Sequence, residues 1–311
     1  MSTHVILGTG TVGLPLAHIL LERGHRVIAV NRSGDRHGLP DGVELRSGDL
    51  TDPAFAASAL QGADVAYQIT QPAYHRWEQE FPALQDAILT AAELTGTAVV
   101  LADNLYCYGT PGDTITEATP ERPSTVKGRV RAAMSDKALA LHAAGRVRVV
   151  LTRPSNYVGA DYELSRNMLV KPALAGKNLQ VLGRTDQPHS FSYVPDVARA
   201  MADIASAEDA WGRAWVLPVL EPLTQQELCQ AIWTAAGQPG DAKVSAIRGP
   251  LMRVLGIFIA PLRASIEMMD EWEKPFTVDA SQFEERFGWK ATTAADAVAA
   301  TVAGATLAGA R

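Results

Sequence analysis

Three glycines near the start of the chain have the spacing of a phosphate-binding turn. Gly8, Gly10 and Gly13 form G-x-G-x-x-G inside VILGTGTVGLPLAHILLERG, where the pattern predicts a strand, a tight turn and a helix. Gly8 permits the turn, Gly10 lets the backbone approach a diphosphate, and Gly13 allows the helix to pack closely on the strand. Thr11 and Val12 complete the turn. The pattern predicts a dinucleotide site, with a tight turn that binds no nucleotide as the alternative.

The end of the second predicted strand, VNRSG (30–34), bears on which dinucleotide binds. NAD-binding proteins usually carry an acidic residue there, which holds the ribose 2′-hydroxyl. This chain instead has Asn31, Arg32 and Ser33. A guanidinium pairs with a 2′-phosphate, which a carboxylate would repel. We therefore expect NADP(H) as the cofactor in preference to NAD(H), unless Arg32 is only a solvated loop residue.

Three cations stand together in KGRVR (127–131), where the apolar spacing predicts the beginning of a helix. The positive end of the helix dipole disfavours cations there. Like charges four residues apart cost roughly a further 0.2–0.5 kcal/mol. At about 100° per residue, Lys127 and Arg131 lie about 40° apart, whereas Arg129 points about 200° from Lys127. Lys127 and Arg131 are therefore expected to share the face that carries Met134, and Arg129 to be solvated.

The elements that must position these residues alternate between β-rich runs and helical patterns. This alternation predicts right-handed βαβ crossovers and an α/β fold with a doubly wound, parallel Rossmann sheet. The strands are expected at 4–8, 26–30, 43–47, 64–68, 97–102 and 147–152, and the helices near 12–23, 53–60, 73–94 and 124–144.

The pattern loosens after about residue 160, which predicts a second region. Residues 1–160 are expected to form the NADP-binding Rossmann domain, completed by segments near 190–220. Residues 161–311 are expected to form a smaller, mostly helical substrate-binding region. Its expected helices lie in the segments KPALAG, TQQELCQAIWTAAG and PLMRVLGIFIAPL.

Composition narrows the functional class. The chain of 311 residues is 47% hydrophobic, as in globular proteins, but has no apolar run long enough to span a bilayer. No signal-peptide pattern occurs, and Cys107 and Cys229 form neither a disulfide framework nor a metal site, so we expect a cytoplasmic protein without metal. A net charge of −6 without blocks argues against nucleic acid or anionic membrane as partners. A small-molecule substrate remains, and a homodimer is left open.

Several segments in order resemble the extended short-chain dehydrogenase/reductase family, also called the NAD-dependent epimerase/dehydratase family. The likeness runs from residue 4 to FGWKATT at 287–293. The matching pieces are VILGTGTVG, GDLTDPAFAASALQGADVAY (48–67), LYCYG (105–109), RPSNYVG (153–159) and FSYVPDVARA (191–200).

The resemblance implies three further groups of cofactor-binding residues. Asp49 and Leu50 would flank the adenine. Gln68, Ile69 and Thr70, which form the QIT tip after the fourth expected strand, would lie beside the cofactor. Pro154, Ser155 and Asn156 would approach the nicotinamide.

The catalytic positions depart from those of the family. The family's chemistry uses a Ser or Thr five residues before the YG glycine and a Tyr-x-x-x-Lys pair, whereas the matching residues here are Asn104, Lys127 and Arg131. The resemblance implies that Lys127 donates a proton to the substrate or anchors its anion, unless the position is degenerate. Asn104 would donate a hydrogen bond to a carbonyl. Arg131 would bind the cofactor ribose or phosphate, or else is a cation on the helix surface.

The substrate pocket is expected to include Tyr74 and His75, which follow the QIT tip, together with Tyr106 and His189. His189 stands where nucleotide-sugar members of the family usually carry Arg, which weakens the case for a nucleotide-sugar substrate. A histidine in such a loop can equally be an ordinary surface residue.

These residues predict an NADP(H)-dependent oxidoreductase of the extended short-chain type that acts on a small carbonyl or hydroxyl compound through a non-standard Lys-x-x-x-Arg site. One alternative is a sugar-nucleotide epimerase or dehydratase. The other is a non-catalytic, NADP-sensing regulator, which the missing Tyr-x-x-x-Lys pair would favour.

Overall fold

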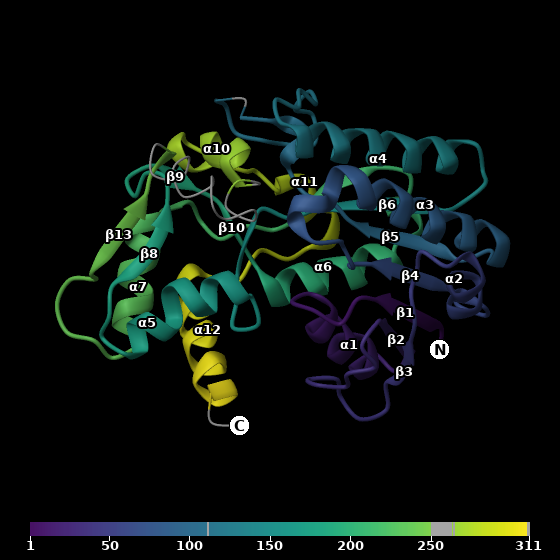
Figure 1. The fold of residues 1–311 in the computed structure, drawn as a ribbon, viewed down its shortest axis with the longest axis horizontal. Helices are drawn as coiled ribbons and strands as arrows, with labels where there is room; N and C mark the ends of the chain where they lie inside the picture. Colours follow the sequence, from purple (N-terminus) through teal and green to yellow (C-terminus); the bar gives the residue numbers. More distant parts are fainter. Residues whose placement is uncertain (111, 250–262, 264, 310–311) are drawn as a thin grey trace. The chain divides into compact units, whose positions relative to one another are not determined.

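The computed structural model describes residues 1–110, 112–249, 263 and 265–309, and these divide into two compact units (Figure 1). The first unit comprises Met1–Cys107, Val126–Arg153 and Val197–Trp215, and the second comprises Tyr108–Thr125, Pro154–Asp196 and Val216–Arg311. In place of one boundary near residue 160, the chain therefore passes between the units several times. The stretch Val197–Trp215 of the first unit falls within the segments near 190–220 that were expected to complete the Rossmann domain, and the role of the second unit in binding substrate stays a prediction.

The first unit is built on a seven-stranded sheet with the order β11-β6-β5-β4-β1-β2-β3. Strands β1 to β6 pair in parallel, which confirms the predicted doubly wound sheet. The strands are β1 (Thr3–Leu7), β2 (Arg26–Asn31), β3 (Glu44–Ser47), β4 (Val65–Gln68), β5 (Ala98–Ala102), β6 (Val149–Arg153) and β11 (Ala214–Val216).

The register of the sheet brings several predicted cofactor residues to one edge. Leu7 at the end of β1 is level with Val30 in β2 and Gln68 in β4. The chain runs outward from β1 in one direction through β2 and β3 and in the other through β4, β5 and β6. Ligands of open α/β sheets bind at the carboxyl ends of the strands where the order reverses in this way.

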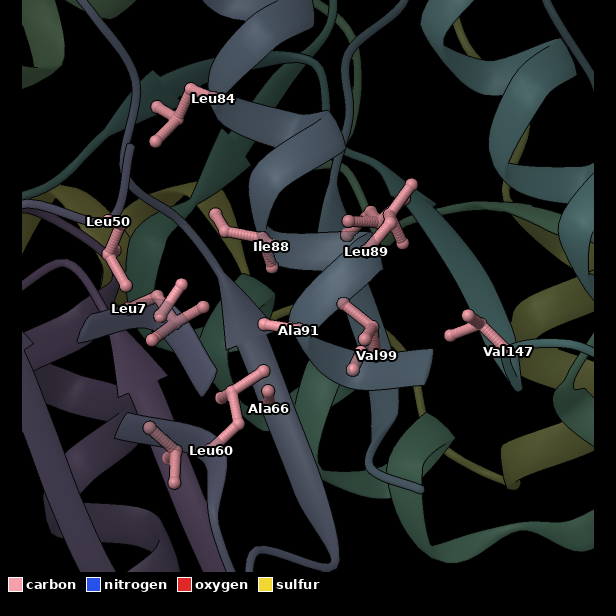
Figure 2. Packing of buried hydrophobic residues seen from close by; sticks show 14 of the residues in the cluster. Leu7, Leu50, Leu60, Ala66, Leu84, Ile88, Leu89, Ala91, Val99 and Val147 are labelled. Carbon is pink, nitrogen blue, oxygen red and sulfur yellow. The ribbon is translucent and has the colours of Figure 1, made fainter. Parts of the chain in front are cut away.

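Helices cover both faces of this sheet. On one face, α2 (Pro53–Leu60), α3 (Trp77–Thr95) and α4 (Val126–Ala143) pack over a core that includes Leu7, Ile88 and Val99 (Figure 2). Helices α1 (Gly13–Glu22) and α6 (Val194–Ser206) are linked by an ion pair of 2.6 Å between Arg23 and Asp203. The strands are buried on both faces and are correspondingly rich in Val, Ile and Leu.

The second unit combines helices with three two-stranded sheets, β10–β7, β12–β9 and β13–β8. These short strands were not predicted, because pairs of two to four residues leave almost no periodic signal. The strands are β7 (Asn156–Val158), β8 (Leu179–Leu182), β9 (Pro188–His189), β10 (Phe191–Tyr193), β12 (Leu223–Thr224) and β13 (Val244–Ile247).

The helices of the second unit form its main core. Two expected helical segments are confirmed, one by α5 (Lys171–Leu174) after the π-helical turn η3 (Ser165–Val170), and one by α7 (Gln225–Ala235), whereas the third, 250–262, lies outside the described residues. Short helices α10 (Met269–Glu273) and α11 (Ser281–Phe287) precede α12 (Ala294–Gly309). Within the described residues, no helix has the length and apolar character needed to cross a membrane, and no group of His, Cys, Asp and Glu side chains could hold a metal ion.

Candidate functional site

The turn after β1 has room for a ligand at one glycine and none at the other two. Gly8 has φ +118°, and a Cβ there would lie 2.8 Å from the Thr70 nitrogen. A Cβ on Gly13 would lie only 2.0 Å from the Gly8 carbonyl oxygen. A Cβ on Gly10 would meet no protein atom within 4 Å. Packing therefore leaves no room for a side chain at Gly8 or Gly13, whereas Gly10 borders open space.

Helix α1 begins at this turn without the usual means of satisfying its first backbone N–H groups. The residue before the helix, Val12, makes no side-chain cap, and the first turn carries no acidic residue. The positive end of the helix dipole is thus available to an anion. The buried Oε1 of Gln68, at the end of the neighbouring strand β4, also accepts no hydrogen bond from any described residue. The turn, the helix end and this orphaned oxygen together fit a dinucleotide.

The loop after β2 is shaped by Asn31 and presents Arg32 to solvent. The Asn31 amide donates to Thr9 Oγ1 at 2.9 Å and to the Asp35 carbonyl at 2.8 Å, and its Oδ1 accepts from the Gly34 N–H at 2.8 Å. Asn31 therefore ties the ends of β1 and β2 together. Arg32 and Ser33 are exposed in the loop that results.

Asp49 and Leu50, implied to flank an adenine, are placed differently from each other. Asp49 is exposed, and hydrogen bonds from the backbone and hydroxyl of Thr51, assisted by the charge of Arg32, hold the pKa of its carboxyl below the usual value. Leu50 is buried in the core that covers the sheet. The electrostatic influence of Arg32 on Asp49 shows that the ends of β2 and β3 share one charged edge.

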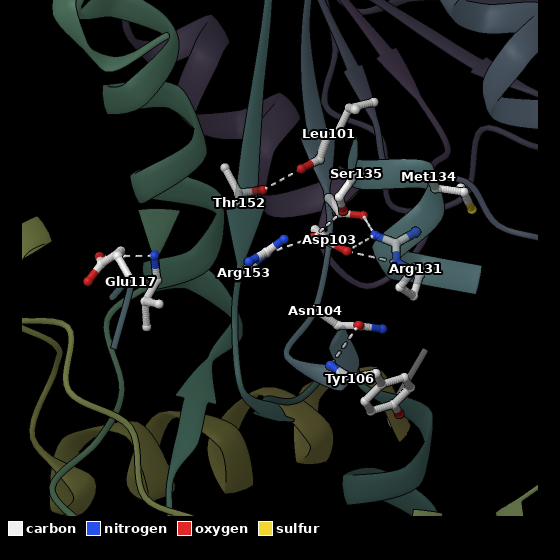
Figure 3. A network of polar contacts seen from close by, with 12 residues as sticks. Leu101, Asp103, Asn104, Tyr106, Glu117, Arg131, Met134, Ser135, Thr152 and Arg153 are labelled. Carbon is white, nitrogen blue, oxygen red and sulfur yellow. Dashed lines mark hydrogen bonds and ion pairs between the residues drawn. The ribbon is translucent and has the colours of Figure 1, made fainter. Parts of the chain in front are cut away.

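A buried ion cluster lies where β5 and β6 end (Figure 3). Asp103 Oδ1 accepts from Arg131 Nε at 2.8 Å, and its Oδ2 accepts from Arg153 Nε at 2.8 Å and from Ser135 Oγ at 2.9 Å. Burial opposes ionisation, but the two guanidiniums outweigh it and hold the pKa of the Asp103 carboxyl below its usual value. Sequence reasoning missed Arg153 and Ser135, although Ser135 follows Arg131 by four residues on the same helix face.

The shared face of α4 is confirmed. Lys127 and Arg131 are 6% and 3% exposed, whereas Arg129 is exposed. The interpretation of Arg131 as a helix-surface cation was therefore wrong. Its guanidinium also donates to the Ala102 carbonyl at 2.8 Å and packs over the Phe81 ring. Its role as a ligand of the cofactor ribose or phosphate stays a prediction.

A chain of contacts connects Lys127 with Asn104. The Lys127 ammonium lies 4.4 Å from the centre of the Tyr74 ring, in a cation–π contact. The Tyr74 hydroxyl donates to the Tyr106 hydroxyl at 3.3 Å, and the Tyr106 backbone N–H donates to Asn104 Oδ1 at 3.1 Å. This last bond orients the Asn104 amide so that its nitrogen is the group left to donate to a ligand. His75, expected beside Tyr74, is exposed.

Four of the predicted residues, Pro154, Ser155, Asn156 and His189, belong to the second unit. The Ser155 hydroxyl donates to the Ser190 carbonyl at 2.7 Å, so it holds the start of β7 in place just after Pro154. The Asn156 amide nitrogen donates to His189 Nε2 at 2.9 Å and to the carboxylate of Glu271.

His189 and Glu271 are both buried, and burial shifts their pKa values in opposite directions. His189 stacks on Trp272 with the ring centres 4.4 Å apart, so its interpretation as a surface residue was wrong. Burial lowers the pKa of His189 to about 3, which keeps Nε2 an acceptor for the amide of Asn156. Burial raises the pKa of Glu271 to about 7 against the opposing hydrogen bond from that amide. Glu271 was not found from the sequence, because nothing in its neighbourhood marks it.

Replacing Glu271 by Gln should change the pH dependence of stability, because Gln keeps an acceptor for Asn156 but does not ionise. The pKa of Glu271 rises from 4.5, its ordinary value, to about 7 in the folded protein. Protonated Glu271 therefore stabilises the fold fully below about pH 4.5, and this stabilisation is lost as the pH rises through 7. Between pH 4.5 and pH 8, the unfolding free energy of Glu271→Gln should rise relative to that of the wild type by on the order of 3 kcal/mol. Urea titrations at each pH measure this difference. The exposed Glu285→Gln serves as control, and parallel pH profiles for Glu271→Gln and wild type would contradict the assignment.

Gly10 and Gly13 form a matched pair of tests. Gly10→Val should leave the unfolding free energy close to that of the wild type but weaken dinucleotide binding, because its side chain enters space reserved for the ligand. Gly13→Val should destabilise the fold itself, since its Cβ collides with the Gly8 carbonyl. Urea unfolding and fluorescence titration with NADPH and NADH measure the two effects. Undiminished nucleotide affinity in Gly10→Val would move the phosphate site elsewhere.

Comparison with solved structures shows the same fold in sugar-nucleotide enzymes. The dTDP-glucose 4,6-dehydratase of Bacillus anthracis in complex with NAD aligns over 99% of this chain and 97% of its own, with a TM-score of 0.81 and 16% identity. The UDP-glucuronic acid 4-epimerase of Bacillus cereus, also in complex with NAD, aligns over 98% and 99% with a TM-score of 0.79 and 14% identity. At such identity the likeness establishes the fold.

Comparison of sequences adds a relative and a family. The 2-alkyl-3-oxoalkanoate reductase of Stenotrophomonas maltophilia (strain K279a) is 25% identical over 253 residues, which cover 75% of this chain and 74% of the relative. The model of the NAD dependent epimerase/dehydratase family matches residues 5–217, from the first strand to the last strand of the seven-stranded sheet. The chain thus belongs to the NAD-dependent epimerase/dehydratase family.

Proposed function

We propose that the protein is an NADP(H)-dependent oxidoreductase that acts on a small carbonyl or hydroxyl compound. The observation that carries the proposal is the connected group Lys127, Tyr74, Tyr106 and Asn104, in which an ammonium and an amide donor are held within one contact chain. Both side chains suit an oxygen that gains negative charge during reduction. The similarity to a bacterial 2-alkyl-3-oxoalkanoate reductase supports carbonyl reduction as the reaction class.

The residues at the turn after β1 would hold the cofactor. Gly8, Gly10 and Gly13 with the start of α1 would receive the diphosphate, and exposed Arg32 would pair with a ribose 2′-phosphate. When bound, the nicotinamide supplies or accepts the hydride.

Lys127 and Asn104 would act on the substrate oxygen. In the direction of reduction, the Lys127 ammonium gives a proton to the oxygen as negative charge develops there, and the neutral amine takes a proton back from solvent. The Asn104 amide N–H donates a hydrogen bond to the same oxygen. Arg131 and Asp103 are positioning residues, because their buried ion pair holds α4 and thereby Lys127.

Two other functions differ from this one in measurable ways. A non-catalytic, NADP-binding regulator is favoured by Arg131, which occupies the place of the family's catalytic Lys and is engaged with Asp103. Such a protein would bind nucleotide and turn over no substrate. A sugar-nucleotide epimerase or dehydratase would retain its nucleotide through purification and release it on denaturation, whereas a reductase exchanges it.

Arg32 should determine the choice between the two cofactors. Loss of a charge-assisted contact with a phosphate costs about 1.5–3 kcal/mol, or roughly 10- to 100-fold in affinity. Arg32→Ala should therefore weaken NADPH binding by this factor and leave NADH binding nearly unchanged in fluorescence titrations. Arg36→Ala is the matched control, because Arg36 is exposed in the same loop but donates to the Val43 carbonyl. Equal affinity of the wild type for NADPH and NADH would rule out this role.

Lys127→Met should lower kcat by on the order of 10²–10⁴, because it removes the proton donor and retains the length of the side chain. Cofactor affinity should change little. Arg129→Met, on the same helical turn but exposed, should leave both quantities unaltered. Steady-state kinetics over a panel of short carbonyl compounds, with NADPH titrations beside them, measure both. A loss of NADPH affinity in Lys127→Met would make Lys127 a phosphate ligand, and full activity would exclude it from the chemistry.

A further inference from the structure

The second unit contains a partly open cavity of about 70 Å³ that reaches Asn156 in β7, one of the residues implied to approach the nicotinamide. Its wall is formed by the turn η3, strands β8 and β10, and helices α7 and α10. Its apolar lining includes the side chains of Met168, Leu169, Val181, Phe191, Leu228 and Trp272.

The described residues that line this cavity include no charged side chain. Two of its polar side chains, those of Gln225 and Asn156, are bound by the protein. The Gln225 amide donates at 2.6 Å to the carbonyls of Leu182 and Arg184, and the Asn156 amide nitrogen donates to His189 and Glu271. A diphosphate or an ionised head group needs cations when it leaves water, and the described lining residues supply none. The cavity suits a hydrocarbon.

The side of the cavity at Asn156 also disfavours an anion. Asn156 donates to Glu271, and burial, assisted by the charge of Glu271, raises the pKa of Tyr162, another lining residue, to about 12. A carboxylate brought into the cavity would lose its hydration in a medium of low dielectric constant, and above about pH 7 it would also be repelled by ionised Glu271. A chain would therefore enter with its methyl end and leave any acidic head group outside.

The volume sets the length of the chain. An engineered apolar cavity of about 150 Å³ accepts a benzene ring of six carbons. The present cavity is about half as large, so it accepts roughly three carbons. We propose that this cavity binds a short, unbranched alkyl chain, which makes the ligand an aliphatic compound. The identification of this ligand as the carbonyl substrate rests on the proposed function. The binding of an alkyl chain in the cavity does not depend on it.

Met168 provides a direct reporter of occupancy. The full-length protein, labelled with methyl-¹³C methionine, would be titrated with 2-alkanones from acetone to 2-nonanone. The Met168 methyl resonance should shift, whereas that of Met134 in the core of the first unit should not. Affinity should rise roughly fourfold for each added methylene until about three carbons are buried, and then level off.

Two variants on one helix make the test specific. Leu228→Ala enlarges the cavity and should move the levelling-off point to longer chains, whereas Ile232→Ala, equally buried in α7 but outside the lining, should lose stability and keep the wild-type chain preference. An unshifted Met168 resonance, or an affinity series that Leu228→Ala does not alter, would overturn the proposal. If 2-alkanones bind but are not reduced, the proposed reaction is refuted and the alkyl site stands. If they are reduced at rates that do not depend on chain length, the alkyl site is refuted and the reaction stands.

Discussion

One buried carboxylate, Asp103, connects β5, β6 and α4 in the first unit. It follows β5 directly, and its two oxygens take up Arg131 and Ser135 from α4 and Arg153 from the end of β6. Because an uncompensated buried charge costs about 3–5 kcal/mol, these groups must stay together. The position of α4 against the sheet is thereby specified, and Lys127 and Asn104, which lie beside members of the cluster in the chain, are carried with it.

The function proposed above dispenses with the family's Tyr-x-x-x-Lys pair. Arg131 stands in the place of the Lys, but its guanidinium is engaged with Asp103 and the Ala102 carbonyl, so its part is to position the helix. In the proposed reaction, Lys127 in the place of the Tyr would supply the proton. The chemistry proposed here therefore needs an ammonium and an amide, where the family uses a phenol and a lysine.

Two buried carboxyl groups, Asp103 in the first unit and Glu271 in the second, have pKa values that are shifted in opposite directions. Asp103 has two cations beside it, and these overcome the cost of desolvation so that the group stays ionised. Glu271 has one amide as its partner, and burial therefore raises its pKa to about 7. Asp103 thus belongs to a structural ion cluster, whereas Glu271 titrates near neutral pH. The two carboxyl groups differ in the number of neighbouring charges.

Local periodicity and motif spacing determined the parallel sheet, its first six strands and the G-x-G-x-x-G turn, because strand alternation, helical repeat and turn chemistry act over a few residues. Helical geometry likewise placed Lys127 and Arg131 on one face. Only the tertiary structure decided what those side chains meet. Asp103 and Arg153 are 50 residues apart, and Asn156 and Glu271 are 115 apart. Such contacts leave no periodic trace in a sequence, since they depend on how distant elements pack, and the buried cluster and the alkyl-sized cavity are products of that packing.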